Sequence, residues 1–141
     1  MRLDSIIRNS GCTVTAGNPL AEVSAVCNDS RKVIPGALFV AVKGFAVDGH
    51  AYIATAVEKG ASVIVYEDTA AVEAVREKDV TLVKAESSRY ALAIIAANFY
   101  DNPSEKLTLV GITGTNGKTT TVTLLHRMFT AMGYSCGLLS T

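Results

Sequence analysis

Apolar residues along this chain follow two spacings: short consecutive runs, and stretches in which they return every three or four residues. Short runs rich in Val, Ile and Phe are typical of strands, and the longer spacing is typical of helices with one buried face. The strands predicted in this way are 24–27, 38–42, 62–66 and 81–83. The predicted helices are 51–59, 70–78 and 90–100, after a short first helix with Leu3, Ile6 and Ile7. This alternation predicts an α/β layered fold.

The last third of the chain repeats the alternation once. The run 107–112 predicts a strand covered on both faces, and 136–140 predicts another. Between them, a helix ending at Gly133 is predicted from its apolar positions Val122, Leu125, Phe129 and Met132. Segment 101–105 interrupts the apolar elements with proline and small polar residues, so we expect two domains, 1–103 and 104–141.

The sequence between the predicted strand and helix is Gly-Ile-Thr-Gly-Thr-Asn-Gly-Lys-Thr-Thr, residues 111–120. A helix start presents unpaired N–H groups and about half a positive charge, so it stabilises phosphate where the backbone can approach closely. Gly114 and Gly117 permit that approach, Lys118 adds a point charge, and the Thr119 hydroxyl suits a magnesium ion. The segment predicts a nucleotide phosphate loop.

A plainer interpretation is that Asn116-Gly117 is an ordinary turn, because Asn-Gly is a strong turn dipeptide. The strict phosphate-loop pattern also places a glycine six positions before the lysine, where this chain has Ile112. A turn alone explains neither Gly114 nor Lys118 followed by paired threonines at a helix start. We therefore favour phosphate binding.

Composition narrows the classes of function. Thirteen basic and thirteen acidic residues cancel without clustering, which argues against a nucleic-acid surface. The uncharged apolar stretches are too short to span a bilayer, and the amino terminus lacks the long apolar centre of a signal peptide, so we expect a cytoplasmic protein. Cys12, Cys27 and Cys136 have neither disulfide-framework nor zinc spacing.

The first hundred residues carry a second group of polar and glycine positions. Asp29-Ser30, Pro35-Gly36 and Asp48-Gly49 have the chemistry of turns, and Ser30 and His50 taken singly are typical of structural residues. In combination they form a longer pattern. It comprises Asp29-Ser30-Arg31, Pro35-Gly36, Leu38-Phe39-Val40-Ala41, Gly44, Asp48-Gly49-His50, Gly60-Ala61 and Asn102-Pro103-Ser104, together with the loop 111–120.

This combination resembles the Mur ligases of bacterial cell-wall synthesis, over nearly the whole chain. The resemblance implies a small amino-terminal α/β domain that binds the uridine diphosphate (UDP) end of a muramyl-peptide substrate, followed by the first β–loop–α–β unit of a central ATPase domain. It places Asn28 and Ser30 near the uridine or its phosphates. Where members often carry a His-Gln-Ala-like triplet, this chain has Phe45, Ala46 and Val47, which leaves backbone contacts and stacking by Phe45.

The resemblance also implies ATP-dependent amide formation through an acyl phosphate, with ATP and Mg²⁺ as cofactors. The residues from Gly114 to Thr120 match the ATP loop of the family: Gly114, Thr115, Asn116, Gly117, Lys118, Thr119 and Thr120. Lys118 would act on the β- and γ-phosphates and is the expected catalytic residue, and Thr119 would ligate magnesium. His126 lies at the helical spacing of Val122 and Phe129, and we interpret it as a surface or packing residue.

Within the family, Asn102-Pro103-Ser104, Thr115 and the segment 137–141 favour the members that add the third amino acid to UDP-N-acetylmuramoyl-L-alanyl-D-glutamate. The substrates would then be that UDP-linked dipeptide and an amino acid, with no obligate protein partner. The alternatives are the D-alanyl-D-alanine-adding members, a non-catalytic UDP-substrate-binding module, and a folylpolyglutamate-synthase-like ligase. The last would lack the pattern of residues 29–50.

Residues 104–141 are too few to cover both faces of a nucleotide-binding sheet, and they hold no carboxylate placed to complete a metal site. We therefore expect further sequence after Thr141, and we expect these 141 residues alone to bind ligand without catalysing ligation.

Overall fold

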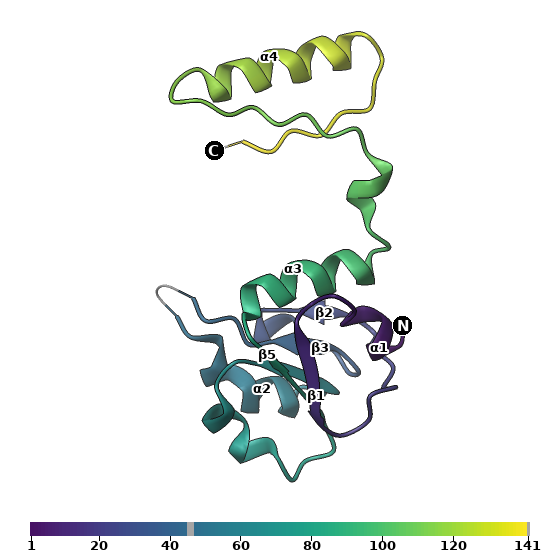
Figure 1. The fold of residues 1–141 in the computed structure, drawn as a ribbon, viewed down its shortest axis with the longest axis vertical. Coiled ribbons are helices and arrows are strands. Elements are labelled where there is room, and N and C mark those ends of the chain that lie inside the picture. Colours follow the sequence, from purple (N-terminus) through teal and green to yellow (C-terminus); the bar gives the residue numbers. More distant parts are fainter. Residues whose placement is uncertain (45–46, 141) are drawn as a thin grey trace. The chain divides into compact units, whose positions relative to one another are not determined.

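The computed structural model describes residues 1–44 and 47–140 (Figure 1). The chain divides into two compact units, residues 1–106 and residues 107–141.

The first unit is built on a five-stranded sheet with the strand order β1-β5-β4-β3-β2. The strands β2 to β5 are parallel to one another, and β1 pairs antiparallel with β5. The parallel strands lie in one register, with Val26, Leu38, Val63 and Thr81 side by side in a row. The bounds are Cys12–Ala16 for β1, Val26–Cys27 for β2, Leu38–Val40 for β3, Val63–Tyr66 for β4 and Thr81–Ala85 for β5.

Helices cover both faces of this sheet (Figure 1). The α-helices of the first unit are α1 (Leu3–Ile6), α2 (Ile53–Glu58) and α3 (Ser88–Phe99). The 3₁₀ segments are η1 (Ser30–Lys32), η2 (Gly49–Tyr52), η3 (Thr69–Val75) and η4 (Pro103–Lys106). The predicted α/β class is confirmed.

Alternation along the strands divides the core into two clusters. In β3, Phe39 packs with α2 and η3, whereas Leu38 and Val40 pack with α1 and α3. In β4, Ile64 and Val65 divide between the clusters in the same way. All of these side chains are buried, as expected for parallel strands covered on both faces.

The structure differs from the sequence-based prediction at several elements. The strand β1 was not predicted, although its Cys-Thr-Val-Thr-Ala sequence alternates apolar and polar residues as half-buried strands do; the structure pairs it with β5. Of the predicted strand 24–27, only Val26–Cys27 is assigned to a strand, β2. In place of the predicted α-helix 70–78, the structure has the 3₁₀ segment η3.

The second unit contains α4 (Lys118–Ala131), which confirms the predicted helix. It ends in a Schellman motif: Gly133 has φ +88°, its N–H donates to Thr130 O, and Tyr134 N–H donates to Phe129 O. The rings of Phe129 and Tyr134 meet edge to face, with centroids 5.8 Å apart. Val122 and Phe129 on the predicted apolar face are half-buried.

The predicted strands 107–112 and 136–140 are wrong, since no residue from 107 to 140 is assigned to a strand. Leu107, Leu109 and Val110 were expected to be buried but are 61–70% exposed. A strand exists only when neighbouring strands satisfy its backbone groups. The described residues of this unit provide one helix and no such neighbours.

Gly17, at the end of β1, offers a test of the sheet. Its φ is +87°, and an added Cβ would lie 2.7 Å from Thr81 Cα. We expect Gly17→Ala to lower the free energy of unfolding by about 2 kcal/mol or more, because it combines backbone strain with a backbone clash. The matched control is Gly11→Ala, at φ +69° with open space around it, which should cost about 1 kcal/mol. Urea denaturation of both variants measures the difference, and equal losses would contradict the close approach of β1 to β5.

Candidate functional site

The loops after the parallel strands β2 to β5 begin at one edge of the sheet, because the strands share direction and register. Ligands of open α/β sheets bind at such a carboxyl edge. Of the predicted uridine-contacting residues, Asn28 and Ser30 follow β2, and Val47 lies in the turn after β3. Phe45 and Ala46 lie outside the described residues. The structure thus brings Asn28, Ser30 and Val47 to neighbouring positions on this carboxyl edge.

The loop after β2 is organised by Asp29. Its Oδ1 accepts a hydrogen bond from Arg31 N at 3.0 Å, and its carboxylate pairs with the Arg31 guanidinium at 2.8 Å. Hydrogen bonding to the Arg31 side chain, and then to its N–H, lowers the pKa of Asp29 to about 2. Ser30 is 8% exposed, and among the described residues its hydroxyl has no hydrogen-bond partner. Asn28 is exposed.

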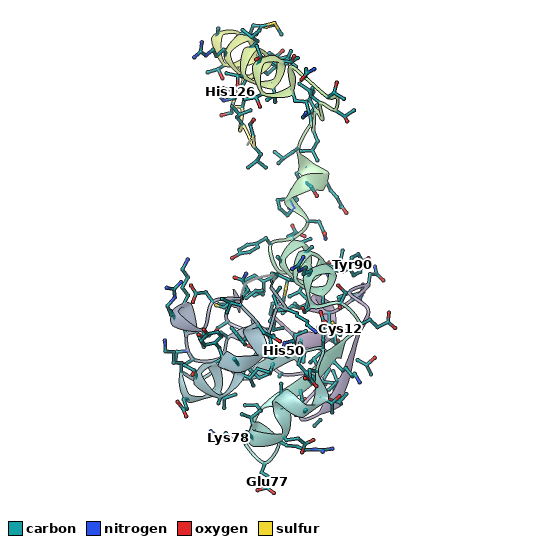
Figure 2. The ribbon with its side chains drawn as sticks, turned by 90° about the vertical axis from the view of Figure 1, so that its left-hand side faces the viewer. Cys12, His50, Glu77, Lys78, Tyr90 and His126 are labelled. Carbon is teal, nitrogen blue, oxygen red and sulfur yellow. The ribbon has the colours of Figure 1, made fainter. Side chains whose placement is uncertain are left out.

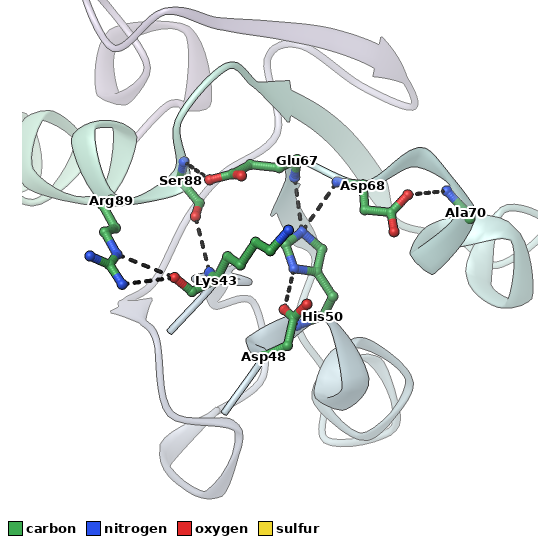
Figure 3. Close-up of polar contacts among 8 residues, drawn as sticks. All are labelled: Lys43, Asp48, His50, Glu67, Asp68, Ala70, Ser88 and Arg89. Atoms are coloured by element: carbon green, nitrogen blue, oxygen red, sulfur yellow. Dashed lines mark hydrogen bonds and ion pairs between the residues drawn. The ribbon is translucent and has the colours of Figure 1, made fainter. Parts of the chain in front are cut away.

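The turn after β3 is closed by an antiparallel β-bridge between the backbones of Lys43 and Asp48. A hydrogen bond from Gly44 N–H to Val47 O at 3.0 Å lies within it. An added Cβ on Gly44 would lie 2.4 Å from Val47 O, so only glycine fits. The Arg89 guanidinium donates to Lys43 O from Nε and Nη2 at 3.2 and 3.1 Å (Figure 3). Val47 itself is exposed.

His50 joins this turn to the loop after β4. Its Nε2 accepts hydrogen bonds from the backbone N–H groups of Glu67 (3.0 Å) and Asp68 (3.3 Å), as Figure 3 shows. Since Nε2 is the acceptor, Nδ1 carries the proton and donates it to Asp48 Oδ1 at 2.6 Å. Asp48 also accepts from His50 N–H, and these bonds hold the pKa of Asp48 below its usual range. His50 is therefore a buried structural residue, as its turn chemistry suggested.

Glu67 continues the network to the start of α3. Its Oε1 accepts from Ser88 N–H at 2.5 Å, and Lys43 N–H donates to Ser88 Oγ at 3.3 Å. The Ser88 side chain and then its N–H hold the pKa of Glu67 below its usual value of 4.5. Lys43, Glu67, Ser88 and Arg89 were not identified from the sequence. The available signals were their positions directly after β3 and β4 and the Ser87-Ser88 pair at a helix start.

The predicted phosphate loop, residues 111–120, lies in the second unit. Gly117, at φ +77°, is the N-cap of α4 and gives no side-chain cap, and Gly114 has φ +148°. Both values are rare for residues with a Cβ, which explains the two glycines. The Lys118 ammonium donates to Gly114 O (2.6 Å) and Thr115 O (3.3 Å), so the lysine folds back over the loop. Every residue from 113 to 120 is exposed, including Asn116, Thr119 and Thr120.

An open pocket of ≈ 540 Å³ adjoins this loop. It is lined by Val110, Gly111, Ile112, Lys118, Thr119, Val122, Leu139 and Ser140. Lys118 and Thr119, the predicted catalytic residue and the predicted magnesium ligand, therefore face one accessible space. His126 is half-buried on the same stripe of α4 as Val122 and Phe129 and does not line the pocket.

The donor set at the loop fits magnesium held mainly by a nucleotide. Within 1–44 and 47–140, no group of three or more His, Cys, Asp or Glu side chains is placed to hold a metal ion. Mg²⁺ prefers oxygen ligands, keeps several waters and commonly binds through substrate phosphates. One hydroxyl, that of Thr119, suits such a site.

In the same described ranges, no helix is long and apolar enough to cross a membrane.

The model of the Mur ligase family, catalytic domain, matches residues 22–100, more than half of the chain. These residues include the carboxyl-edge loops and end before the phosphate loop. The chain therefore belongs to the Mur ligase family.

A similar curated protein is the UDP-N-acetylmuramoyl-L-alanyl-D-glutamate--2,6-diaminopimelate ligase of Cytophaga hutchinsonii, 48% identical over all 141 residues. The protein of the same name from Phocaeicola vulgatus is 45% identical over the same length. The chain spans 29% and 28% of these relatives, less than a third of their length.

Solved structures of the family have a similar fold. MurF from Acinetobacter baumannii matches with a TM-score of 0.68 at 23% identity, over 93% of this chain and 28% of that one. MurF ligase from Thermotoga maritima, solved in complex with ADP, matches with a TM-score of 0.55 at 35% identity, over 76% of this chain and 23% of that one.

The lowered pKa of Glu67 gives the carboxyl-edge network a pH dependence. A carboxyl whose pKa is lower in the folded state stabilises the fold above its unfolded pKa, near 4.5, and loses this effect as pH falls through the folded value. We expect Glu67→Gln to lower the free energy of unfolding at pH 7 and to lower it much less near pH 3. Urea denaturation at both pH values measures the change. A loss independent of pH would show that the ionised carboxylate does not support the Ser88 N–H.

Proposed function

We propose that this chain is part of an ATP-dependent Mur ligase that adds the third amino acid to UDP-N-acetylmuramoyl-L-alanyl-D-glutamate during peptidoglycan synthesis. The names of the relatives from C. hutchinsonii and P. vulgatus support the substrate and suggest 2,6-diaminopimelate as the amino acid. The observation that carries the proposal is the phosphate loop, which presents Lys118 and Thr119 to an open pocket at the start of α4.

We assign different tasks to the two parts of the chain. Residues 1–103 would bind the UDP end of the substrate at the carboxyl edge, with Asn28, Ser30 and the turn 45–47 as contacts. Residues 104–141 would begin the ATP-binding domain. The boundary between the two compact units, which falls in the sequence between residues 106 and 107, supports this division.

The proposed reaction has two transfers. A carboxylate oxygen of the substrate attacks the γ-phosphorus of ATP, the bond to the β-phosphate oxygen breaks, and ADP leaves. The amine of the incoming amino acid then attacks the acyl carbon, inorganic phosphate leaves, and the amine loses a proton to give the amide. Phosphorylation is needed because the oxygen of a free carboxylate is a poor leaving group.

The protein's part in phosphoryl transfer is positioning and charge neutralisation. Backbone N–H groups from Gly114 to Gly117 would surround the phosphates. The Lys118 ammonium now bonds two loop carbonyls, and it would exchange these for the β- and γ-phosphate oxygens, which carry full charge. Thr119 would ligate Mg²⁺, which supplies further positive charge when bound.

The cytoplasm is the proposed location. Cys12, Cys27 and Cys136 are unpaired thiols, and free thiols are usual in reducing compartments.

A second member of the family remains a candidate. The resemblance left the D-alanyl-D-alanine-adding members as an alternative, and the match to MurF ligase from T. maritima at 35% identity supports keeping a second Mur ligase activity open. Turnover of the complete ligase with each pair of substrates separates these activities, and we expect the third-amino-acid reaction to be the faster.

Lys118→Ala tests the catalytic assignment. In the complete ligase we expect turnover to fall by about a hundredfold or more, because the variant loses the positive charge that neutralises the transferring phosphoryl group. Binding of the UDP-linked dipeptide should be unchanged, since it uses the other unit. Steady-state kinetics and calorimetry measure the two effects separately, with Lys78→Ala as the control for removal of an exposed lysine. Turnover within about tenfold of the wild type would exclude Lys118 as the residue that neutralises the negative charge of the phosphoryl group.

Calorimetry of the 141-residue chain tests the two binding assignments. We expect it to bind UDP through the first unit and to show weaker binding of ATP with Mg²⁺. UDP binding with no detectable ATP binding, combined with an inactive complete protein, would favour the non-catalytic module. Binding of ATP without UDP would contradict the assignment of the carboxyl edge.

A further inference from the structure

Lys43 is held in place by its backbone, and the fold leaves its side chain unused. Its N–H donates to Ser88 Oγ at 3.3 Å, and its carbonyl oxygen accepts two hydrogen bonds from Arg89 at 3.2 and 3.1 Å. An antiparallel β-bridge between the backbones of Lys43 and Asp48 closes the turn that follows. Among the described residues, the Lys43 ammonium has neither a hydrogen-bond nor an ion-pair partner. The main chain is therefore positioned rigidly, and the charge remains available.

The side chain extends along the carboxyl edge. In Figure 3 it runs from the turn after β3 toward His50 and Glu67. Its charge also contributes, after the dominant hydrogen bonds, to the lowered pKa values of Asp48 and Glu67. Both observations place the ammonium over the loops that follow β3 and β4.

The acidic groups near this ammonium already have other partners. Asp48 accepts from His50 N–H and from His50 Nδ1–H, and Glu67 accepts from Ser88 N–H. At the end of the adjacent strand β2, the nine-tenths buried Ser30 has a hydroxyl without a partner in the described part of the chain. The edge thus offers an anion the Lys43 ammonium and the Ser30 hydroxyl, neither of which the described fold uses.

We propose that Lys43 contacts the diphosphate of the UDP group bound at the carboxyl edge and thereby selects a nucleoside diphosphate over an uncharged nucleoside. This proposal rests on the proposed function and adds a specificity-determining residue to it. An ammonium is a compact point charge with three donors, which suits phosphate oxygens. Because Lys43 is exposed, its effect is screened by salt.

The test compares UDP with uridine by calorimetry on the 141-residue chain and its Lys43→Gln variant. We expect the variant to bind UDP about tenfold or more weakly, which is the typical effect of a charge-assisted hydrogen bond, and to bind uridine as the wild type does. The salt dependence of UDP binding should also decrease. Lys43→Arg should retain part of the UDP affinity, since it keeps the charge.

Lys78→Gln is the matched control. Lys78 is exposed in the loop before β5, at the opposite edge of the sheet, and Figure 2 shows it at the tip of this loop, away from His50. It removes the same charge from the same unit and should leave UDP binding unchanged. Urea denaturation should show both variants folded, since neither side chain supports a contact of the core.

Three outcomes are informative. Unchanged UDP binding by Lys43→Gln would overturn the proposal and leave Lys43 as a charge balance for Asp48 and Glu67. Equal weakening for UDP and uridine would also overturn it, since the effect would then lie in the loop conformation. A wild-type chain that binds neither UDP nor uridine would contradict the proposed function itself, which distinguishes that failure from the other two.

Discussion

The parallel register of β2 to β5 is the constraint on which the rest of the first unit depends. Val26, Leu38, Val63 and Thr81 lie in one row across the sheet, so the loops that follow these strands begin at the same level. Parallel pairing requires crossover connections, and those that contain α2 and η3 cover one face of the sheet. The helices α1 and α3, which lie before β1 and after β5, cover the other face, so the strands are buried on both sides. A single pairing pattern therefore creates both the core and the edge at which a ligand can meet several loops.

Loops gathered at one edge leave backbone groups that the sheet does not satisfy, and side chains satisfy them here. His50 accepts the N–H groups after β4, Glu67 accepts the N–H at the start of α3, and Asp48 accepts from both the backbone and the ring of His50. These bonds cross-link three loops and lower the pKa values of the two carboxyls. Such a network ties the loops of the carboxyl edge to one another and to the ends of the strands that they follow.

The second unit follows a different principle, because its ordered features are local. The positive φ angles of Gly114 and Gly117, the fold-back of Lys118 and the Schellman motif at Gly133 all involve residues within a few positions of one another. Its two apolar runs depend on distant partners for their hydrogen bonds, and they remain exposed and outside any strand. The predicted phosphate loop takes its shape without a sheet around it, whereas the expected strands 107–112 and 136–140 do not form.

The sequence by itself determined the features that local chemistry controls: the α/β alternation, the helix end at Gly133, and the glycines and lysine of the loop 111–120. It also indicated Asn28, Ser30 and the turn at 45–47 through resemblance, and their roles stay predictions. Only the tertiary structure decided that Cys12–Ala16 pairs antiparallel with β5, that 107–112 is not a strand, and that Lys43, His50, Glu67 and Ser88 meet at one edge. The reason is that strand pairing and polar networks join residues far apart in the chain, and no local pattern encodes which distant partner satisfies a given backbone group.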